Sequence, residues 1–290
     1  MEMSSFQQPA AAAYRTLEVK GLRNGQPIQE QDCVAEEVPV AFEFNGISHA
    51  VMMATPDDLE DFALGFALSE GIVESAHQVH GVEISSTHQG YTLHIHIAAS
   101  RFARLKDMRR NLTGRTGCGL CGTESLAHAV RTPCSLGTPV RFGAKAVATA
   151  MQNLRSRQLL LSVTGSTHAA AWCNSEGNIN LIREDLGRHN ALDKLVGALA
   201  RSALQPGSGF VAVTSRASYE MVQKTACAGI GTLAAVSGVT GLAVEVAQQA
   251  GLTLLGRASQ ARPHFHGGSR EAFTKKPRRE HLLALGPAQR

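Results

Sequence analysis

The second half of the chain alternates short apolar runs with amphipathic helical segments, and this alternation constrains the fold more than any other feature. Six apolar runs have strand length: Leu159–Val163, Ala169–Trp172, Ile179–Arg183, Phe210–Val213, Thr232–Val236 and Leu252–Leu255. Three segments have helical periodicity: Arg188 to about Leu204, Ala217–Gly229 and Val239–Gln249. Strands that alternate with helices form a mixed or parallel sheet that the helices cover.

The first half has a different pattern, with paired strands and two helices. Asn45-Gly46 lies between the apolar runs Pro39–Phe44 and Ile47–Met53, which predicts a tight hairpin. Thr55-Pro56-Asp57-Asp58 predicts the start of a helix, with Thr55 as its N-cap and Gly71 after its end. The remaining predictions are strands at Val82–Ser85 and Tyr91–Ile97, a basic helix from about Arg101 to Leu112, and a short helix at Glu124–Arg131.

These patterns predict a mixed α/β protein with a smaller α+β subdomain at residues 36–143 and an α/β domain at residues 144–257. Residues 1–35 are rich in Ala and Gln, so we expect a flexible leader that adds one strand near Tyr14–Val19. Residues 258–290 form a basic tail, which either binds phosphate or is solvated.

Composition indicates a soluble globular protein. The 290 residues are 43% apolar and 18% charged, with a net charge of +4. The N-terminus lacks a secretory pattern, and no uncharged apolar run reaches membrane-spanning length. We therefore expect a cytoplasmic protein that binds neither membrane nor nucleic acid. In a reducing compartment the six cysteines should not form disulfides, and Cys33, Cys134, Cys173 and Cys227 should pack as small apolar residues.

A pair of cysteines separated by two residues, Cys118 and Cys121, lies in a glycine-rich stretch after a basic segment. Glycine allows a large partner to approach the sulfur atoms closely, and positive charge favours the reactive thiolate. The pair is compatible with a reactive loop, a zinc half-site or an inert loop. No second CxxC completes a standard zinc site, so we favour the reactive loop.

Polar residues gather where several predicted strands begin or end. His168 follows a small-residue turn, and it either binds a ligand or is a hydrogen-bonded core histidine. Asp185, with Arg188 and His189, precedes a helix, where it either binds phosphate or guanine or forms an ion-paired cap. Ser215, Arg216 and Ser218 suit an anion in the same way, and Arg257 and Arg262 follow the last strand.

Seven motifs, in this order and spacing, closely resemble those of the formate dehydrogenase accessory sulfurtransferase family (FdhD/NarQ). They are Ala35-Glu-Glu-Val-Pro-Val, Asn45-Gly-Ile-Ser-His, Phe62–Gly71 ending in Ser-Glu-Gly, Gly114-Arg-Thr-Gly-Cys-Gly-Leu-Cys-Gly122, Thr167-His-Ala-Ala-Ala, Glu184-Asp-Leu-Gly-Arg-His-Asn-Ala-Leu-Asp-Lys194 and Ser215-Arg-Ala-Ser-Tyr-Glu-Met-Val-Gln-Lys224. The resemblance runs from about Ala35 to Gly256.

The resemblance implies a homodimeric sulfurtransferase with a cytidine deaminase-like fold in its α/β domain. Such proteins move persulfide sulfur from an L-cysteine desulfurase to the molybdenum cofactor, Mo-bis(molybdopterin guanine dinucleotide), which formate dehydrogenase needs. By resemblance Cys118 carries the sulfur and Cys121 assists. The cofactor is the bound substrate, and no intrinsic metal is implied. The chain lacks the His-x-Glu and Pro-Cys-x-x-Cys motifs of a deaminase zinc site.

The resemblance also implies a cofactor contact in the segment after the last strand. Here that segment is Arg257, Ala258, Ser259, Gln260, Ala261 and Arg262. Arg257 and Ala261 stand where the family pattern has an aromatic residue and a glycine. Of the residue roles that the resemblance implies, this cofactor contact therefore matches the family pattern least well. We add His168, Asp185, His189, Ser215 and Arg216 as further candidate cofactor-binding residues. Two alternatives remain: a cofactor-binding chaperone that carries no sulfur, and a zinc protein.

Overall fold

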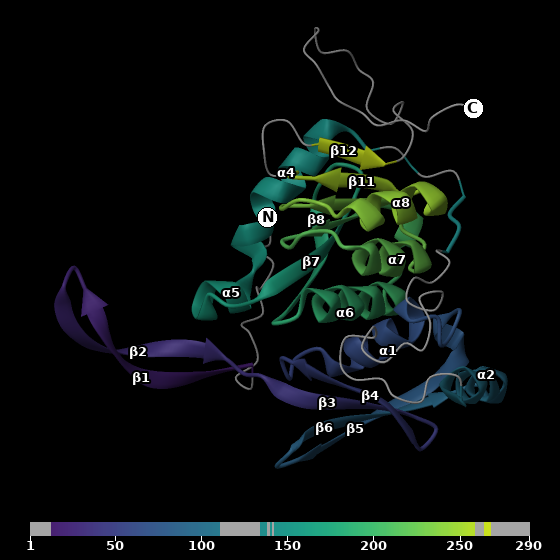
Figure 1. Ribbon diagram of the computed structural model, residues 1–290, viewed down its shortest axis with the longest axis horizontal. Helices are drawn as coiled ribbons and strands as arrows, with labels where there is room; N and C mark the ends of the chain where they lie inside the picture. Colours follow the sequence, from purple (N-terminus) through teal and green to yellow (C-terminus); the bar gives the residue numbers. More distant parts are fainter. Residues whose placement is uncertain (1–12, 111–133, 138–139, 141, 259–263, 268–290) are drawn as a thin grey trace, which may run out of the picture.

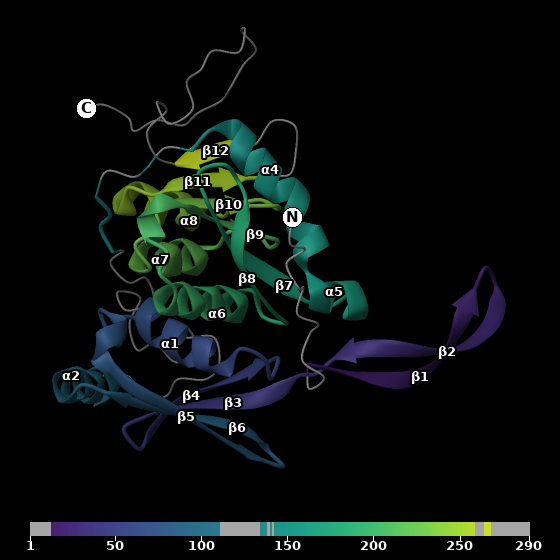
Figure 2. The same cartoon turned by 180° about the vertical axis from the view of Figure 1, so that it is seen from behind.

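The computed structural model describes residues 13–110, 134–137, 140, 142–258 and 264–267. Three β-sheets of two, four and six strands organise these residues. Figure 1 shows the six-stranded sheet and its helices above the four-stranded sheet, and Figure 2 shows the same arrangement from behind. The two-stranded sheet projects to one side. The predicted mixed α/β fold is therefore confirmed.

The six-stranded sheet has the order β12-β11-β10-β9-β7-β8. Its strands are β7 (His168–Cys173), β8 (Ile179–Asp185), β9 (Phe210–Val213), β10 (Thr232–Ala235), β11 (Thr253–Gly256) and β12 (His264–Gly267). Strands β9, β10 and β11 are parallel, and β7 is antiparallel to both β8 and β9. The carboxyl ends of β8, β9, β10 and β11 therefore lie beside the amino end of β7, in one row of strand ends that is hereafter called the edge of the sheet.

Helices cover both faces of this sheet, because its central strands are apolar on both sides. Helices α6 (Arg188–Arg201), α7 (Tyr219–Cys227) and α8 (Gly241–Ala250) pack on one face, with α4 (Ala144–Leu154) on the other. Neighbouring residues of β9 illustrate the alternation: Val211 belongs to the first core and Ala212 to the second. Short 3₁₀ turns occupy Ala76–Gln78 (η1), Arg155–Arg157 (η2) and Pro206–Ser208 (η3).

The four-stranded sheet has the order β4-β3-β6-β5 and packs against α1 (Leu59–Ser69). Its strands are β3 (Val38–Phe44), β4 (Ile47–Ala54), β5 (Val79–Thr87) and β6 (Gly90–Ile97), and α2 (Ala99–Arg110) follows. The predicted hairpin is confirmed, since Asn45 and Gly46 both have positive φ and connect β3 to β4. Phe42 stacks on Phe66 and meets Phe62 edge to face, so aromatic packing dominates this core.

Helices α1 and α6 approach each other closely and join the two halves of the molecule. Two glycines permit this contact. A Cβ at Gly65 would overlap the carbonyl of Asp193, and one at Gly197 would overlap the carbonyl of Asp61. Any side chain at either position would push the helices apart, so these glycines fix the distance between the two halves.

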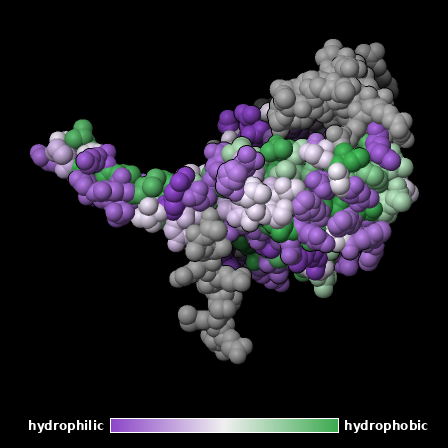
Figure 3. Space-filling model, turned by 90° about the horizontal axis from the view of Figure 1, so that it is seen from below, coloured by the Kyte–Doolittle hydropathy of each residue, from purple (hydrophilic) through white to green (hydrophobic). Residues whose placement is uncertain are grey.

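The projecting two-stranded ribbon consists of β1 (Tyr14–Arg23) and β2 (Gln26–Ala35). Figure 3 shows it extending away from the body, with polar and apolar side chains intermixed along it. Leu17 and Leu22 are exposed on it. The sequence predicted one strand near Tyr14–Val19 in a flexible leader, whereas two strands form over residues 14–35.

Two other local predictions were wrong. Leu159–Val163, predicted as a strand, belongs to the short helix α5 (Leu159–Thr164). The carboxylate of Glu184 accepts hydrogen bonds from the backbone N–H groups of Leu160 and Leu161, so a distant acid caps this helix. Thr55 does not cap α1. Asp58 is its N-cap, and Thr55 is buried in a contact with β8 instead.

Candidate functional site

The predicted site residues that the structure describes lie along one edge of the six-stranded sheet. His168 opens β7 opposite Asp185, which ends β8. Ser215 and Arg216 follow β9, and Arg257 follows β11. Backbone hydrogen bonds connect these chain segments in series, since Ser237 N donates to the carbonyl of Ser215 and Arg257 N donates to the carbonyl of Ser237. The sheet topology therefore brings together residues that are about ninety positions apart in the sequence.

Asp185 is fully buried, and its carboxylate is already saturated with donors. Oδ2 accepts from the backbone N and Oγ1 of Thr55 at 3.0 Å each and lies 2.7 Å from Nζ of Lys194. Oδ1 accepts from Gly187 N and from Nδ2 of Asn190 at 2.9 Å each. The sequence left open whether Asp185 binds a ligand or forms an ion-paired cap. Its contacts favour the cap, because the carboxylate holds the β8–α6 turn against the first half of the chain.

A second buried cluster joins the same two halves. Nζ of Lys224 donates to both carboxylate oxygens of Asp193 at 2.9 Å, to Oε1 of Glu70 at 2.7 Å and to Oγ of Ser69 at 3.0 Å. Burial alone would lower the pKa of Lys224, but the charges of Asp193 and Glu70 outweigh burial and raise it. Much of the charge in the Glu184–Lys194 and Ser215–Lys224 motifs is therefore paired within the protein. The four paired residues are hereafter called the interdomain lock: Asp185, Lys194, Asp193 and Lys224.

The cations left at the edge are not neutralised in this way. Arg188, at the start of α6, has a lowered pKa because of burial and the nearby charge of Arg216, an effect that Glu220 partly offsets. Arg216 is exposed, and the like charges of the two guanidinium groups repel each other unless an anion lies between them. Among the residues that the structure describes, neither Nε of Arg188 nor Oγ of Ser218 has a hydrogen-bond partner, although both atoms are buried.

Ser218 is also the N-cap of α7, yet its hydroxyl makes no capping hydrogen bond. Only 8% of the residue is exposed. The amino termini of α6 and α7 open at this edge, and helix amino termini favour negative charge. Arg188, Arg216 and Ser218, hereafter the anion site, thus combine two cations, an unpaired hydroxyl and two helix ends. This geometry fits a phosphate group, which supplies several acceptor oxygens.

Histidine side chains border the anion site. Burial, followed by the charge of Arg188, lowers the pKa of the half-buried His168. Its imidazole is therefore neutral near pH 7 and able to donate or accept one hydrogen bond per nitrogen. Nε2 of His189 lies 2.9 Å from Oε2 of Glu220. Glu220 was not among the predicted site residues, although its place just after the Ser218 cap was a usable signal.

The neighbourhood of Glu220 favours its charged form. Burial would raise the pKa of this carboxyl, but the hydrogen bond and charge of His189, with Lys224 and Arg188, lower it overall. Ser215 is buried, and its hydroxyl donates to the carbonyl of Arg216 at 2.9 Å. Ser215 therefore shapes the turn after β9 while its oxygen can still accept a hydrogen bond.

The segment after β11 is described only at its start. Arg257 is exposed and has a positive φ of 52°, a conformation that costs free energy for a residue other than glycine. Ala258 is buried in the core beneath α4, so its side chain faces away from the edge. Ser259, Gln260, Ala261 and Arg262 lie outside the described residues.

The CxxC pair, Cys118 and Cys121, also lies outside the described residues, as does the helix predicted at Glu124–Arg131. The basic segment before it is described in part. Arg101 was expected to add to a positive field, but it is buried and donates to Glu74 at 2.7 Å and to the carbonyl of Ile72. Its charge therefore holds α2 in place and is already neutralised.

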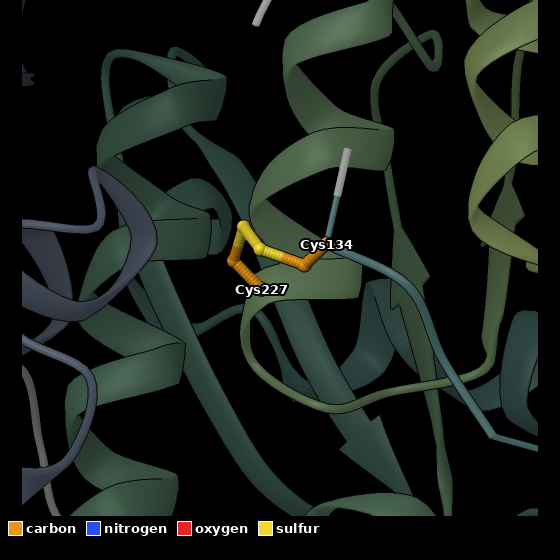
Figure 4. Close-up of a disulfide and its surroundings, with 2 residues drawn as sticks. All are labelled: Cys134 and Cys227. Atoms are coloured by element: carbon orange, nitrogen blue, oxygen red, sulfur yellow. A yellow bond between two sulfur atoms is a disulfide. The ribbon is translucent and has the colours of Figure 1, made fainter. Parts of the chain in front are cut away.

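Cys134 and Cys227 form a disulfide, contrary to the expectation of free, packed thiols (Figure 4). The bond connects the described connector that begins at Cys134 to the last residue of α7, across 93 positions of sequence. Sequence spacing gave no signal for this pair, because the two cysteines become neighbours only through the tertiary fold. Cys33 and Cys173 are free, and Cys173 is buried as predicted.

None of the helices within the described ranges combines the length and apolar composition needed to cross a membrane.

Comparisons with known proteins agree with one another. The model of the FdhD/NarQ family matches residues 35–271. A protein of Variovorax paradoxus strain S110 named "Sulfur carrier protein FdhD" is 58% identical over 240 residues, covering 83% of this chain and 86% of its own length. A protein of the same name from Cupriavidus necator is 55% identical over 254 residues, covering 86% of this chain and 88% of its own.

A solved structure has the same fold. It is described as a putative formate dehydrogenase accessory protein from Desulfotalea psychrophila, with a TM-score of 0.68 at 21% identity. The similarity covers 90% of this chain and all of that one.

Proposed function

The chain belongs to the FdhD/NarQ family, and from this membership we propose that it is a sulfurtransferase that carries persulfide sulfur to the molybdenum cofactor of formate dehydrogenase. The observation that carries the proposal is the close similarity to proteins named sulfur carrier, over more than four fifths of the chain. The anion site adds independent support, because a nucleotide-bearing cofactor is a polyphosphate ligand.

The transfer begins on Cys118. Its thiolate attacks the outer sulfur of a persulfide on an L-cysteine desulfurase, the sulfur–sulfur bond of the donor breaks, and the donor cysteine leaves as a thiolate. Cys118 then carries the persulfide, and no oxidant or reductant is needed. Cys121 assists in retaining or releasing the sulfur. Delivery of the outer sulfur to the cofactor would break the sulfur–sulfur bond and return Cys118 to its thiolate form, and the two electrons that turn this sulfur into a sulfide ligand would come from the reduced metal centre.

The cofactor is the substrate, and the anion site is where we place its guanine nucleotide end. The guanidinium groups of Arg188 and Arg216 and the hydroxyl of Ser218 bind the phosphates, with the amino termini of α6 and α7 behind them. His168 donates or accepts a hydrogen bond at the rim. Glu220, held ionised beside His189, is suited to accept hydrogen bonds from the N–H groups of a guanine.

The experiment that tests the proposal loads the purified chain with a desulfurase and cysteine and then measures peptide masses. We expect a gain of about 32 Da, one sulfur atom, on the peptide that contains Cys118. The adduct should disappear in Cys118→Ala and persist in Cys33→Ala, a matched control at a free thiol on the ribbon. A chain that receives no sulfur in any condition would falsify the carrier role.

A second candidate function is a chaperone that protects the cofactor without carrying sulfur, and the anion site alone would support it. The two functions separate in Cys118→Ala, which retains the anion site. If formate dehydrogenase still matures with this variant, the chaperone function is correct. The carrier function predicts that maturation fails while guanosine diphosphate binding is retained.

The proposed partners follow from this chemistry. They are an L-cysteine desulfurase, the formate dehydrogenase that receives the cofactor, and a second copy of this chain in a homodimer. We place the protein in the cytoplasm, with neither membrane nor nucleic acid as partner. Size-exclusion chromatography with light scattering tests the dimer, and co-purification tests the other two partners.

A further inference from the structure

We propose that the Cys134–Cys227 disulfide is a thiol-exchange site, at which a dithiol reductant opens the bond in the folded protein and releases residues 134–137 from α7. This inference concerns cysteines other than the CxxC pair, and it does not depend on the sulfur-carrier proposal. The bond lies at the carboxyl end of α7, about 13 Å from the Ser218 cap at a rise of about 1.5 Å per residue.

The two cysteine residues differ in exposure, and we infer the direction of the exchange from this difference. Cys134 is exposed, whereas Cys227 is half-buried where α7 ends. A thiolate reaches an exposed sulfur more readily, and exposed disulfides are the labile ones. The fully buried Cys173 provides a contrast within the same chain, because burial raises the pKa of its thiol to about 12 and keeps it unreactive.

Within the described residues, few other contacts attach the connector that the bond fastens. Ser135 and Gly137 are exposed beside Cys134. Leu136 packs partly against the core beneath α7 and α8, and its N–H donates to the carbonyl of Ala250 at 3.1 Å. The core itself is made by other residues of α7, including the buried Met221 and Val222. Opening the disulfide therefore frees the connector without dismantling the core.

The exchange proceeds in two balanced steps. A thiolate of the reductant attacks Sγ of Cys134, the disulfide breaks, and Cys227 leaves as a thiolate that takes up a proton. The second thiol of the reductant then attacks the mixed disulfide and releases Cys134. Two electrons pass from the dithiol to the protein, and the reductant ends as a disulfide. An oxidised dithiol reverses the reaction.

The test uses the full chain, with Cys118→Ala/Cys121→Ala as a parallel sample in which the CxxC pair cannot contribute. Each is incubated with dithiothreitol under native conditions, trapped with an alkylating reagent and digested. We expect loss of the peptide pair linked through Cys134 and Cys227, a gain of about 2 Da before alkylation, and no label on Cys173. If the bond opens only when Cys173 is also labelled, reduction requires unfolding and the proposal fails.

Two further measurements test the direction and the consequence of the exchange. With an oxidised disulfide reagent, the Cys134 thiol of Cys227→Ser should react faster than the Cys227 thiol of Cys134→Ser. Equal rates would contradict the attack on Cys134. Hydrogen exchange at the Leu136 amide should accelerate on reduction while the amides inside β9 stay protected. An unchanged Leu136 amide would show that the bond does not fasten the connector, which would also overturn the proposal.

Discussion

The interdomain lock and the anion site both lie at helices α6 and α7 and the strand ends before them, but their charges are paired in the lock and unpaired in the anion site. In the lock, Asp185 and Asp193 are each surrounded by donors, and Lys194 and Lys224 complete the pairs. In the anion site, Arg188 and Arg216 repel each other and Oγ of Ser218 has no partner within the described part of the chain. The buried charges of the lock are satisfied and serve the fold, whereas buried polar atoms without a partner beside the half-buried Arg188 and the exposed Arg216 indicate a ligand.

The largest expected effect comes from removing one member of the lock. Lys224→Met leaves the buried carboxylate of Asp193 without its cation, and we expect the free energy of unfolding to fall by about 3–5 kcal/mol. Urea denaturation followed by circular dichroism measures the change. The double variant Lys224→Met/Asp193→Leu removes both charges, so it should recover part of the loss. Equal stability of the single and double variants would contradict a paired lock.

Substitutions in the anion site should have the opposite effect to those in the lock: they should weaken ligand binding and leave the stability of the fold unchanged or higher. Arg188→Met removes a charge-assisted contact, so we expect binding of guanosine diphosphate to weaken by about 10- to 100-fold, from a loss of about 1.5–3 kcal/mol. Stability should stay equal or rise, because the repulsion with Arg216 is relieved. Isothermal titration calorimetry and thermal unfolding measure the two quantities.

Arg183→Met is the matched control for this prediction. Arg183 pairs with Asp61 at 2.7 Å between β8 and α1, away from the anion site. We expect this variant to lose stability and keep its affinity for guanosine diphosphate. If Arg183→Met and Arg188→Met have the same effects, the distinction between lock and anion site is wrong.

The sequence predicted the sheet and its site edge because strand ends depend on local patterns. Polar residues after the apolar runs placed Ser215 and Arg216 at the same edge as Asp185 and His189, and the topology brings these strand ends together. The same patterns could not show that Asp185 is paired within the protein while Arg188 is free to bind a ligand. Both are charged residues before a helix, and only the position of Thr55, 130 residues away, shows that Asp185 is already saturated.

The failures share a physical cause. Leu159–Val163 has strand composition but forms a helix because Glu184, on a strand, caps its amino end. Cys134 and Cys227 pair across 93 positions, which no local spacing encodes. Thr55 looks like a helix cap but bonds to Asp185 instead. In each case a tertiary contact outweighs a local preference.

The smallest expected effect comes from Asp57, at the rim of the lock, and it sharpens the comparison. Burial raises the pKa of Asp57 from 3.8 to about 6. The negative charges of Asp58 and Asp185 also raise it, and the positive charge of Lys194 partly offsets the rise. The folded state therefore binds the proton more tightly than the unfolded state. The resulting stabilisation is complete below about pH 4 and is lost as the pH rises through 6.

Asp57→Asn removes this titration, so the variant should match the wild type near pH 4 and exceed its stability at pH 7. The gain should stay below about 1 kcal/mol, because solvent screens a half-exposed carboxylate. Urea denaturation at several pH values measures the difference. If the difference in the free energy of unfolding between Asp57→Asn and the wild type does not change with pH, the negative charge of Asp57 is tolerated. The cations of the lock would then neutralise Asp57 as well.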